Sequence, residues 1–286
     1  MNYRIVTDTC CDFPQEMYKE LDLAVVSLTV TYNGTDYNTY TEQWLKEMFD
    51  GLRKGADAKT CAVNPEGWRS VIEPELKQGK DVLVMAFSSG LSTTYQSAVI
   101  AAEELKEEYP ERTINVVDTL CASLGQGLLV YYACQKRDEG LSLQELTQWV
   151  EDNKLHLCHW VTVDDLMYLK RGGRVSATTA LMGSMLQIKP IIHVDDAGKL
   201  INVGKARGRK ASLDTVVKKM VETQIPGAND TVFICHGDCL EDAQYVEKVL
   251  KEQHGVKNVF IYYVGAVIGS HSGPGTIALF FLGEKR

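Results

Sequence analysis

Short apolar runs alternate with amphipathic segments along most of this chain, and this alternation is the strongest constraint on its fold. Runs such as 81–87 and 113–118 have the length and composition of buried strands. The segment 94–105 that separates them repeats apolar residues at helical spacing. Strands that alternate with helices build a parallel sheet with helices on both faces. We therefore predict a doubly wound, mainly parallel α/β sheet in the first half of the chain.

The pattern changes at about His156, where we expect a second domain to begin. Residues 189–206 read as a β-hairpin with a turn at Asp196–Gly198, and two later strands are separated by a helix. A chain of 286 residues is also long for one compact core. We predict two α/β domains: an N-terminal domain over residues 1–155 that contains the parallel sheet, and a mixed-sheet domain over residues 156–286 that closes the site.

Charge and hydropathy restrict the class of partner. The formal net charge of −8 argues against a general nucleic-acid-binding protein. No apolar run approaches the length needed to cross a bilayer, and the first residues lack the apolar core of a signal peptide. We therefore expect a cytoplasmic protein without stable membrane insertion, in which the eight cysteines are reduced.

Four loops rich in hydroxyl or acidic side chains are expected at one edge of the first sheet. In open α/β sheets, ligands bind beyond the carboxyl ends of the strands. The loops are Thr7–Asp12, Lys59–Pro65, Ser88–Thr94 and Asp118–Ser123. A Ser, Thr or Asp before a helix is usually only a cap. The loop that begins at Ser88 has more hydroxyls than one cap requires, and hydroxyls beside a helix N-terminus favour an anion site.

Two other kinds of site are less consistent with the sequence. Glycine-rich nucleotide motifs of the Rossmann or Walker type do not occur in their required context. Cys and His lie close together in His156–His159 and in Cys235–Cys239, but buried strand residues explain these stretches more simply than a metal site does. We therefore predict no cofactor and no metal.

The stretch Gly90–Thr94 suggests an alternative function. It reads G-x-S-x-T, one residue short of the G-x-S-x-G elbow of serine hydrolases, and it lies between a strand and a helix, where such an elbow belongs. His271 follows it in the order of that class, and several aspartates could complete a triad. The alternative is a serine hydrolase or acyltransferase that uses Ser92 and His271.

Two further stretches concentrate polar side chains in the second half of the chain. Tyr168–Ser176 holds Lys170, Arg171 and Arg174 around two glycines, and Gly269–Gly275 places a histidine between two serines. A basic run alone is more often a solvated surface than a site. Together with the basic residues between 205 and 210, these stretches predict a cationic edge that faces the hydroxyl-rich loops.

Five stretches stand in the order and spacing of one known family: TDTCCD, SSGLSTTYQSA, VVDT, LMYLKRGGR and GSHSGPG. Over almost its whole length, this chain resembles that family, the DegV-like family of bacterial fatty-acid-binding proteins. The resemblance implies two α/β domains that hold a long-chain fatty acid, and a carrier rather than an enzyme. It also implies a partner, an ATP-dependent fatty acid kinase that phosphorylates the bound carboxylate for phospholipid synthesis.

The resemblance also implies roles for individual residues. Ser92 resembles the family serine that binds the fatty-acid carboxylate, and His271 matches the histidine of the H-x-G-P-G segment. Thr60 begins the matching loop, which reads TCAVNP here where the family often has TSQPS. Arg171 matches the arginine of K-R-G-G-R and is expected to serve the kinase or phosphoryl transfer. Additional candidate ligands are Ser88, Ser89, Thr93 and Ser270, of which Thr93 replaces a family glycine and narrows the pocket.

Overall fold

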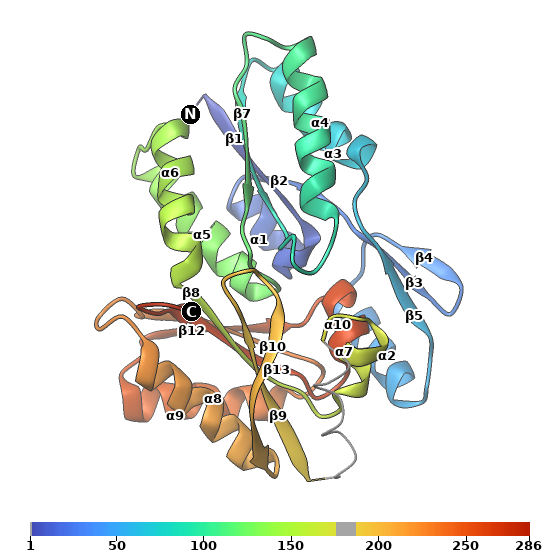
Figure 1. The fold of residues 1–286 in the computed structure, drawn as a ribbon, viewed down its shortest axis with the longest axis vertical. Helices are drawn as coiled ribbons and strands as arrows, with labels where there is room; N and C mark the ends of the chain where they lie inside the picture. The colour runs from blue at the N-terminus through green and yellow to red at the C-terminus, as the bar shows by residue number, and fades with distance from the viewer. Residues whose placement is uncertain (1, 176–186) are drawn as a thin grey trace.

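The computed structural model describes residues 2–175 and 187–286, whose strands form three sheets (Figure 1). The first sheet is parallel and has the strand order β2-β1-β6-β7. Its strands are β1 (Tyr3–Asp8), β2 (Leu23–Val26), β6 (Asp81–Ala86) and β7 (Ile114–Asp118). The central strands β1 and β6 are almost entirely buried, as the continuous apolar runs predicted.

Helices cover both faces of this sheet, which confirms the predicted doubly wound arrangement. In Figure 1, α3 and α4 lie on one side of the strands and α5 and α6 on the other. Asn64 caps the start of α3, where Pro65 occupies the first helical position, as its sequence predicted. The helices of this half are α1 (Gln15–Glu20), α2 (Glu42–Arg53), α3 (Pro65–Lys77), α4 (Thr94–Glu108), α5 (Leu124–Asp138) and α6 (Leu143–Asn153), with the 3-10 turn η1 (Thr9–Cys11) after β1.

The second sheet is mixed, as predicted, and has the strand order β10-β9-β8-β13-β11-β12. Only the pair β11–β12 is parallel among its described pairs. The strands are β8 (Leu157–Thr162), β9 (Ile188–Val194), β10 (Leu200–Arg207), β11 (Thr231–His236), β12 (Asn258–Tyr263) and β13 (Ile277–Leu282). The predicted hairpin is β9–β10.

Helices α8 (Arg209–Thr223) and α9 (Leu240–His254) cover one face of the second sheet, and α5 packs on the other (Figure 1). Helix α5 therefore lies between the two sheets. On one side its residues share a core with Phe233 and Phe280, and on the other Gln126 donates to Thr7 Oγ1 at 3.2 Å. Two short helices, α7 (Met167–Arg171) and α10 (Ala266–Ser272), pack together beside the second sheet.

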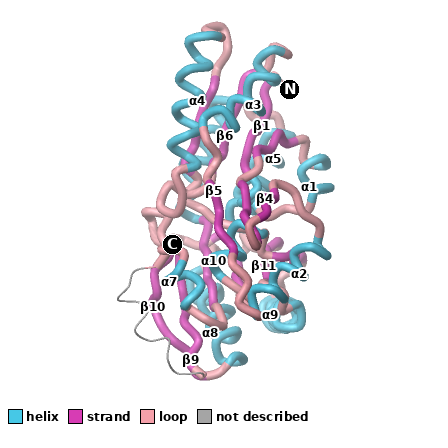
Figure 2. The backbone as a smooth tube through the Cα atoms, turned by 90° about the vertical axis from the view of Figure 1, so that its right-hand side faces the viewer, coloured by secondary structure: helices cyan, strands magenta, loops and turns pink. Residues whose placement is uncertain are grey.

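A third, antiparallel sheet corrects one expectation from the sequence. It contains β3 (Thr29–Tyr32), β4 (Thr35–Tyr37) and β5 (Ala58–Cys61), in the order β4-β3-β5. Residues 59–61 were predicted to lie in a loop at the edge of the parallel sheet, but they form most of β5. The strand forms because β3 offers a free edge with which β5 pairs. Figure 2 shows β5 running toward α10, against which it packs.

The predicted boundary lies in the connection between α6 and β8. The 3-10 turn η2 (Lys154–His156) follows α6, and β8 begins directly after it at Leu157. The division at residues 155 and 156 stays a prediction. No helix in the described part of the chain combines the length and the apolar character that crossing a bilayer requires.

Candidate ligand-binding site

A cavity of about 500 Å³ lies between the second sheet and the loops at the carboxyl ends of the first-sheet strands. Val161, Ala278 and Phe280 on neighbouring strands of the second sheet line one side. Phe87 and Leu91, which follow β6, line another. Most of the lining side chains are apolar, so the cavity suits an aliphatic ligand.

Three side chains from distant parts of the sequence bring polar atoms to this cavity. Thr60 on β5 and His271 on α10 place Oγ1 and Nε2 2.8 Å apart, within hydrogen-bond distance. Ser92, two residues before α4, lines the same cavity, and its hydroxyl lies 2.8 Å from Thr94 Oγ1. The structure thus brings together all three residues that were singled out as carboxylate ligands. Whether they bind a carboxylate stays a prediction.

Burial, together with the positive charge of Arg174, lowers the pKa of His271 to about 4. The imidazole is therefore neutral at neutral pH when no anion is beside it. A neutral histidine carries one donor and one acceptor nitrogen. A bound carboxylate would raise this pKa again, because an adjacent negative charge favours the imidazolium form.

The additional candidates divide into two groups. Ser89 and Thr93 line the cavity. Ser88 and Ser270 use their hydroxyls elsewhere: Ser88 donates to the carbonyl of Gly198 at 2.8 Å, and Ser270 donates within its own helix to Ala266 at 2.6 Å. A ligand-binding role for any of these four residues stays a prediction.

Sequence reasoning missed Arg174 as a cavity residue. Arg174 lines the cavity and donates from Nε to the carbonyl of Leu91 at 3.3 Å. The chain turns back after α7 at Gly172 and Gly173, and a side chain at Gly172 would collide with the His271 ring. A pair of arginines flanking two glycines was visible in the sequence. The turn that brings the second arginine toward His271 was not.

A second cavity of about 390 Å³ shares Thr60, Arg174 and His271 with the first. Its lining also includes Lys59 and Arg171. Arg171 is exposed, and its guanidinium lies 4.6 Å from the centre of the Tyr168 ring. The pair formed by Thr60 and His271 therefore stands between an apolar chamber and a cationic one. We call these the inner cavity and the outer cavity.

The acidic loop after β1 has a different role from the loop after β6. Asp8 is fully buried and accepts hydrogen bonds from the backbone N–H groups of Cys10 at 2.9 Å and Phe87 at 2.8 Å. Burial raises the pKa of Asp8 to about 6 and that of Asp12, which accepts from Ser123, to about 7. The Asp8 carboxylate thus fixes the backbone around the site, whereas Asp12 is paired with a side-chain hydroxyl.

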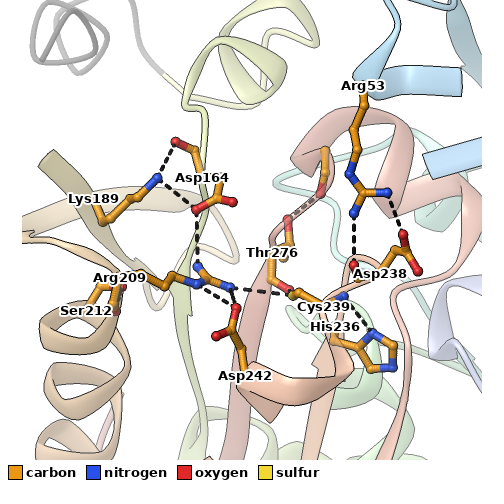
Figure 3. Close-up of polar contacts among 11 residues, drawn as sticks. Arg53, Asp164, Lys189, Arg209, Ser212, His236, Asp238, Cys239, Asp242 and Thr276 are labelled. Atoms are coloured by element: carbon orange, nitrogen blue, oxygen red, sulfur yellow. Dashed lines mark hydrogen bonds and ion pairs between the residues drawn. The ribbon is translucent and has the colours of Figure 1, made fainter. Parts of the chain in front are cut away.

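Arg209 of the predicted cationic edge, and the nearby Lys189, which was not part of that prediction, are neutralised by acidic neighbours (Figure 3). Arg209 pairs with Asp242 at 2.8 Å, and Lys189 pairs with Asp164 at 2.8 Å. In the nearby stretch Cys235–Cys239, the backbone N–H of Cys239 donates to His236 Nδ1 at 3.3 Å, so this ring nitrogen already has a backbone partner. Within the described residues, no group of three or more Cys, His, Asp or Glu side chains has the arrangement of a metal site.

The hydrolase alternative finds no support in this geometry. The Ser92 hydroxyl accepts from the N–H of Thr94 at 3.2 Å and pairs with the Thr94 hydroxyl. The His271 nitrogen that would act as a base is paired with Thr60. Asp118, a candidate third member, accepts from the N–H groups of Ser89 and Leu120, both at 3.1 Å. The serine and the histidine line one cavity but do not form a nucleophile–base pair.

Comparisons with known proteins agree with this fold. The model of the family described as "Uncharacterised protein, DegV family" matches residues 2–284. A DegV domain-containing protein of Clostridium perfringens is 46% identical over 99% of this chain and 98% of its own length. Another, from Lactococcus lactis, is 36% identical over 100% of this chain and 99% of its own length.

Two solved structures show the same fold. A DegV family protein from Thermus thermophilus, described as binding fatty acid, has a TM-score of 0.88 and 30% identity, with coverage of 99% of this chain and 100% of that one. A DegV lipid-binding protein from Thermotoga maritima has a TM-score of 0.87 and 26% identity, with coverage of 100% of both chains. The match of the family model over residues 2–284 and the 46% identity to a relative over 99% of this chain show that the chain belongs to the DegV family.

Proposed function

We propose that this protein binds a long-chain fatty acid without chemically changing it and presents the carboxylate to a partner. The observation that carries this proposal is that Thr60, Ser92 and His271 bring polar atoms to a cavity whose lining is mostly apolar. The described relatives from Thermus thermophilus and Thermotoga maritima, which bind fatty acid or lipid, support it.

The two parts of the cavity would contribute differently to binding. Burial of each methylene group contributes about 0.8 kcal/mol, so the acyl tail dominates affinity. The hydroxyls of Thr60 and Ser92 can donate to a carboxylate, and His271 can add a third donor. These contacts set the orientation of the ligand, with its carboxylate at the wall between the inner and outer cavities.

We further propose that the partner is a cytoplasmic fatty acid kinase that phosphorylates the bound carboxylate. The outer cavity supports this, because it lies next to Thr60 and His271 and is lined by Lys59, Arg171 and Arg174. Positive groups stabilise the charge that develops on a transferring phosphoryl group. The exposed position of Arg171 leaves its guanidinium within reach of a phosphate.

Organic extraction of the purified protein followed by mass spectrometry tests the binding proposal. We expect a fatty acid of about 14–18 carbons, because a tail of that length gains several kcal/mol from burial. A protein that is extracted empty and stays empty after incubation with palmitate or oleate would contradict the proposal. Stoichiometric labelling of Ser92 by a fluorophosphonate would instead restore the hydrolase alternative.

The kinase proposal is tested with Arg171→Ala, with Lys170→Ala as the matched control on the same helix. We expect Arg171→Ala to keep its fatty acid and its melting temperature but to lose most acyl-phosphate formation with a cognate fatty acid kinase. Lys170→Ala should behave like the wild type, since Lys170 does not line the outer cavity in the described structure. Unchanged turnover in the Arg171 variant would remove this residue from the mechanism.

A further inference from the structure

The turn between β9 and β10 reaches from the second sheet to the first domain and rests against the loop after β6 (Figure 1). Ser88 donates its hydroxyl proton to the carbonyl of Gly198 at 2.8 Å, across 110 residues of sequence. The same hydroxyl accepts from the N–H of Gly90 at 3.1 Å. Arg286 adds a second link, because its Nη1 donates to the carbonyls of Leu120 at 2.7 Å and Asp195 at 3.2 Å.

The two surfaces fit closely because glycines stand at the contact. A Cβ atom on Gly90 would lie 2.5 Å from the carbonyl oxygen of Ala197 and 2.7 Å from that of Gly198. A Cβ atom on Gly198 would lie 2.1 Å from Ser88 Oγ. Backbone atoms therefore meet backbone atoms here, and a single methyl group is enough to separate them.

The docked turn forms part of the wall of the inner cavity. Val194, the last residue of β9, and Leu200, the first residue of β10, line that cavity. Ser89 and Leu91, which flank the contact on the first domain, line it as well. Lifting the turn from the loop would separate these two pairs of side chains and open the apolar cavity to solvent.

The β9–β10 turn is held together by its own hydrogen bonds, so it would move as one unit. The Asp195 carboxylate accepts hydrogen bonds from the N–H groups of Ala197 at 3.0 Å and Lys199 at 2.8 Å. The N–H of Gly198 donates to the carbonyl of Asp195 at 2.9 Å, so the turn is internally closed. Across the gap, the link through Ser88 is a single neutral hydrogen bond, which is weaker on balance than the charged link through Arg286.

We propose that the β9–β10 turn is a gate through which the acyl chain enters and leaves, and that Ser88 is its latch. This inference rests on the proposed function. The N–H groups of Leu91 and Ser92 donate to the carbonyl of Ser88 at 3.1 Å and 3.2 Å. The same short loop thus carries both the latch residue Ser88 and the head-group residue Ser92. A bound carboxylate that orders this loop therefore also favours the closed position of the β9–β10 turn.

Two variants open the latch in physically different ways. Ser88→Ala removes the hydrogen bond, and Gly90→Ala inserts a methyl group between the two backbones. Stopped-flow fluorescence with cis-parinaric acid, released into phosphatidylcholine vesicles, measures dissociation, and mixing with free probe measures association. We expect both rate constants to rise about fivefold or more, the factor that the loss of a typical hydrogen bond gives. The dissociation constant should change less than about threefold, because a gate lowers the barrier in both directions.

Matched controls separate the gate from general damage to the fold. Gly204→Ala adds the same methyl group on β10, where the nearest heavy atom outside the chain neighbours is 3.7 Å away. Ser97→Ala removes a hydroxyl that donates only within α4, to Thr93. Both controls should retain wild-type rates. Ser92→Ala should instead change the dissociation constant, because it acts on the head group.

The possible failures are distinguishable. If the wild type binds cis-parinaric acid and both latch variants keep its melting temperature and its rates, the gate is overturned and the proposed function stands. If the wild type binds no fatty acid by extraction or by titration, the proposed function falls and the gate falls with it. A change in the dissociation constant with unchanged association would make Ser88 a binding residue rather than a latch.

Discussion

Two loops at the same edge of the first sheet resemble each other in sequence but differ in structure. The loop after β1, residues 8–12, and the loop after β6, residues 88–94, both carry several polar side chains just beyond a buried strand. In the first loop, Asp8, Thr9 and Asp12 are all buried. In the second, Ser89, Ser92 and Thr93 face a cavity.

The difference comes from the partners within reach. Both oxygens of Asp8 are taken by backbone N–H groups, one in its own loop and one beyond β6. Ser92 pairs with a neighbouring threonine two residues away, an exchangeable contact between two hydroxyls. Polar residues whose partners are backbone groups hold the fold, whereas those whose partners are hydroxyls at a cavity can exchange them for a ligand. The predictions below test this contrast, beginning with the largest effect.

Replacing Asp8 should damage the fold far more than the site. Asp8→Ala leaves two buried N–H groups without an acceptor, at a cost of about 1–3 kcal/mol each. We expect the free energy of unfolding to fall by about 2–5 kcal/mol in urea denaturation. Asp8→Asn, which keeps one acceptor oxygen, should lose less. If Asp8→Ala unfolds like the wild type but loses fatty acid, the contrast between the loops is wrong.

Asp12 should give the stability an unusual dependence on pH. Because burial raises its pKa from 3.8 to about 7, the folded state binds more protons than the unfolded state between these values. This contribution is fully present below about pH 4 and is lost as the pH rises through about 7. Relative to the wild type, Asp12→Asn should therefore gain stability with rising pH, on the order of 4 kcal/mol over that range.

Urea denaturation of both proteins at a series of pH values measures this difference directly. Histidines buried in the neutral form, such as His236 and His271, change the stability in the opposite sense. Because burial lowers the pKa of each to about 4, their contribution to the free energy of unfolding grows as the pH rises. They are present in both proteins and cancel in the comparison. Parallel pH profiles for the wild type and Asp12→Asn would show that the Asp12 carboxyl titrates alike in the folded and unfolded states.

Replacing Ser92 should damage the site far more than the fold. Ser92→Ala removes a hydroxyl donor that faces the cavity, and we expect the affinity for oleate to fall about 5- to 30-fold. Its melting temperature without ligand should change little, because its polar partners lie only two residues away. Isothermal titration with delipidated protein measures the affinity, and Ser97→Ala serves as the control. Equal affinity in both variants would remove Ser92 from the site.

The smallest effect is expected at Thr93. Its side chain is exposed and makes no capping hydrogen bond at the start of α4. Thr93→Ala should change the free energy of unfolding by no more than about 0.5 kcal/mol. The adjacent Thr94 is buried and paired with Ser92, so Thr94→Ala should cost clearly more. A comparable loss in the two variants, measured by thermal unfolding, would mean that exposure at this loop does not separate structural from ligand-facing hydroxyls.

The sequence predicted the elements whose causes are local. Apolar runs and helical periodicity gave the parallel sheet, the Asn33–Gly34 turn has the positive φ angles of 48° and 82° that its residues favour, and the β9–β10 hairpin is present. Thr60 was expected in a loop but lies in β5, because strand pairing depends on the distant partner β3.

The parts of the site that the sequence did not reveal depend on contacts between distant segments. Arg174 reaches the cavity because a turn at two glycines brings it back toward His271. Ser88 looked like one more hydroxyl of an anion-binding loop, yet its partner is a carbonyl 110 residues later. Neither contact can be read from the local sequence, since each joins segments that are far apart in the chain.

The position of α5 between the two sheets makes the two halves thermodynamically inseparable. Gly125 lies so close to His159 of the second sheet that an added Cβ would stand 2.2 Å from its Nε2. An added Cβ on Gly127 would stand 2.7 Å from the carbonyl oxygen of Cys11, in the 3-10 turn after β1. Because α5 packs closely against both sheets, it cannot unfold together with one sheet and remain folded against the other. The molecule should therefore lose its secondary and tertiary structure in one cooperative transition, without a half-folded intermediate in which one sheet survives alone.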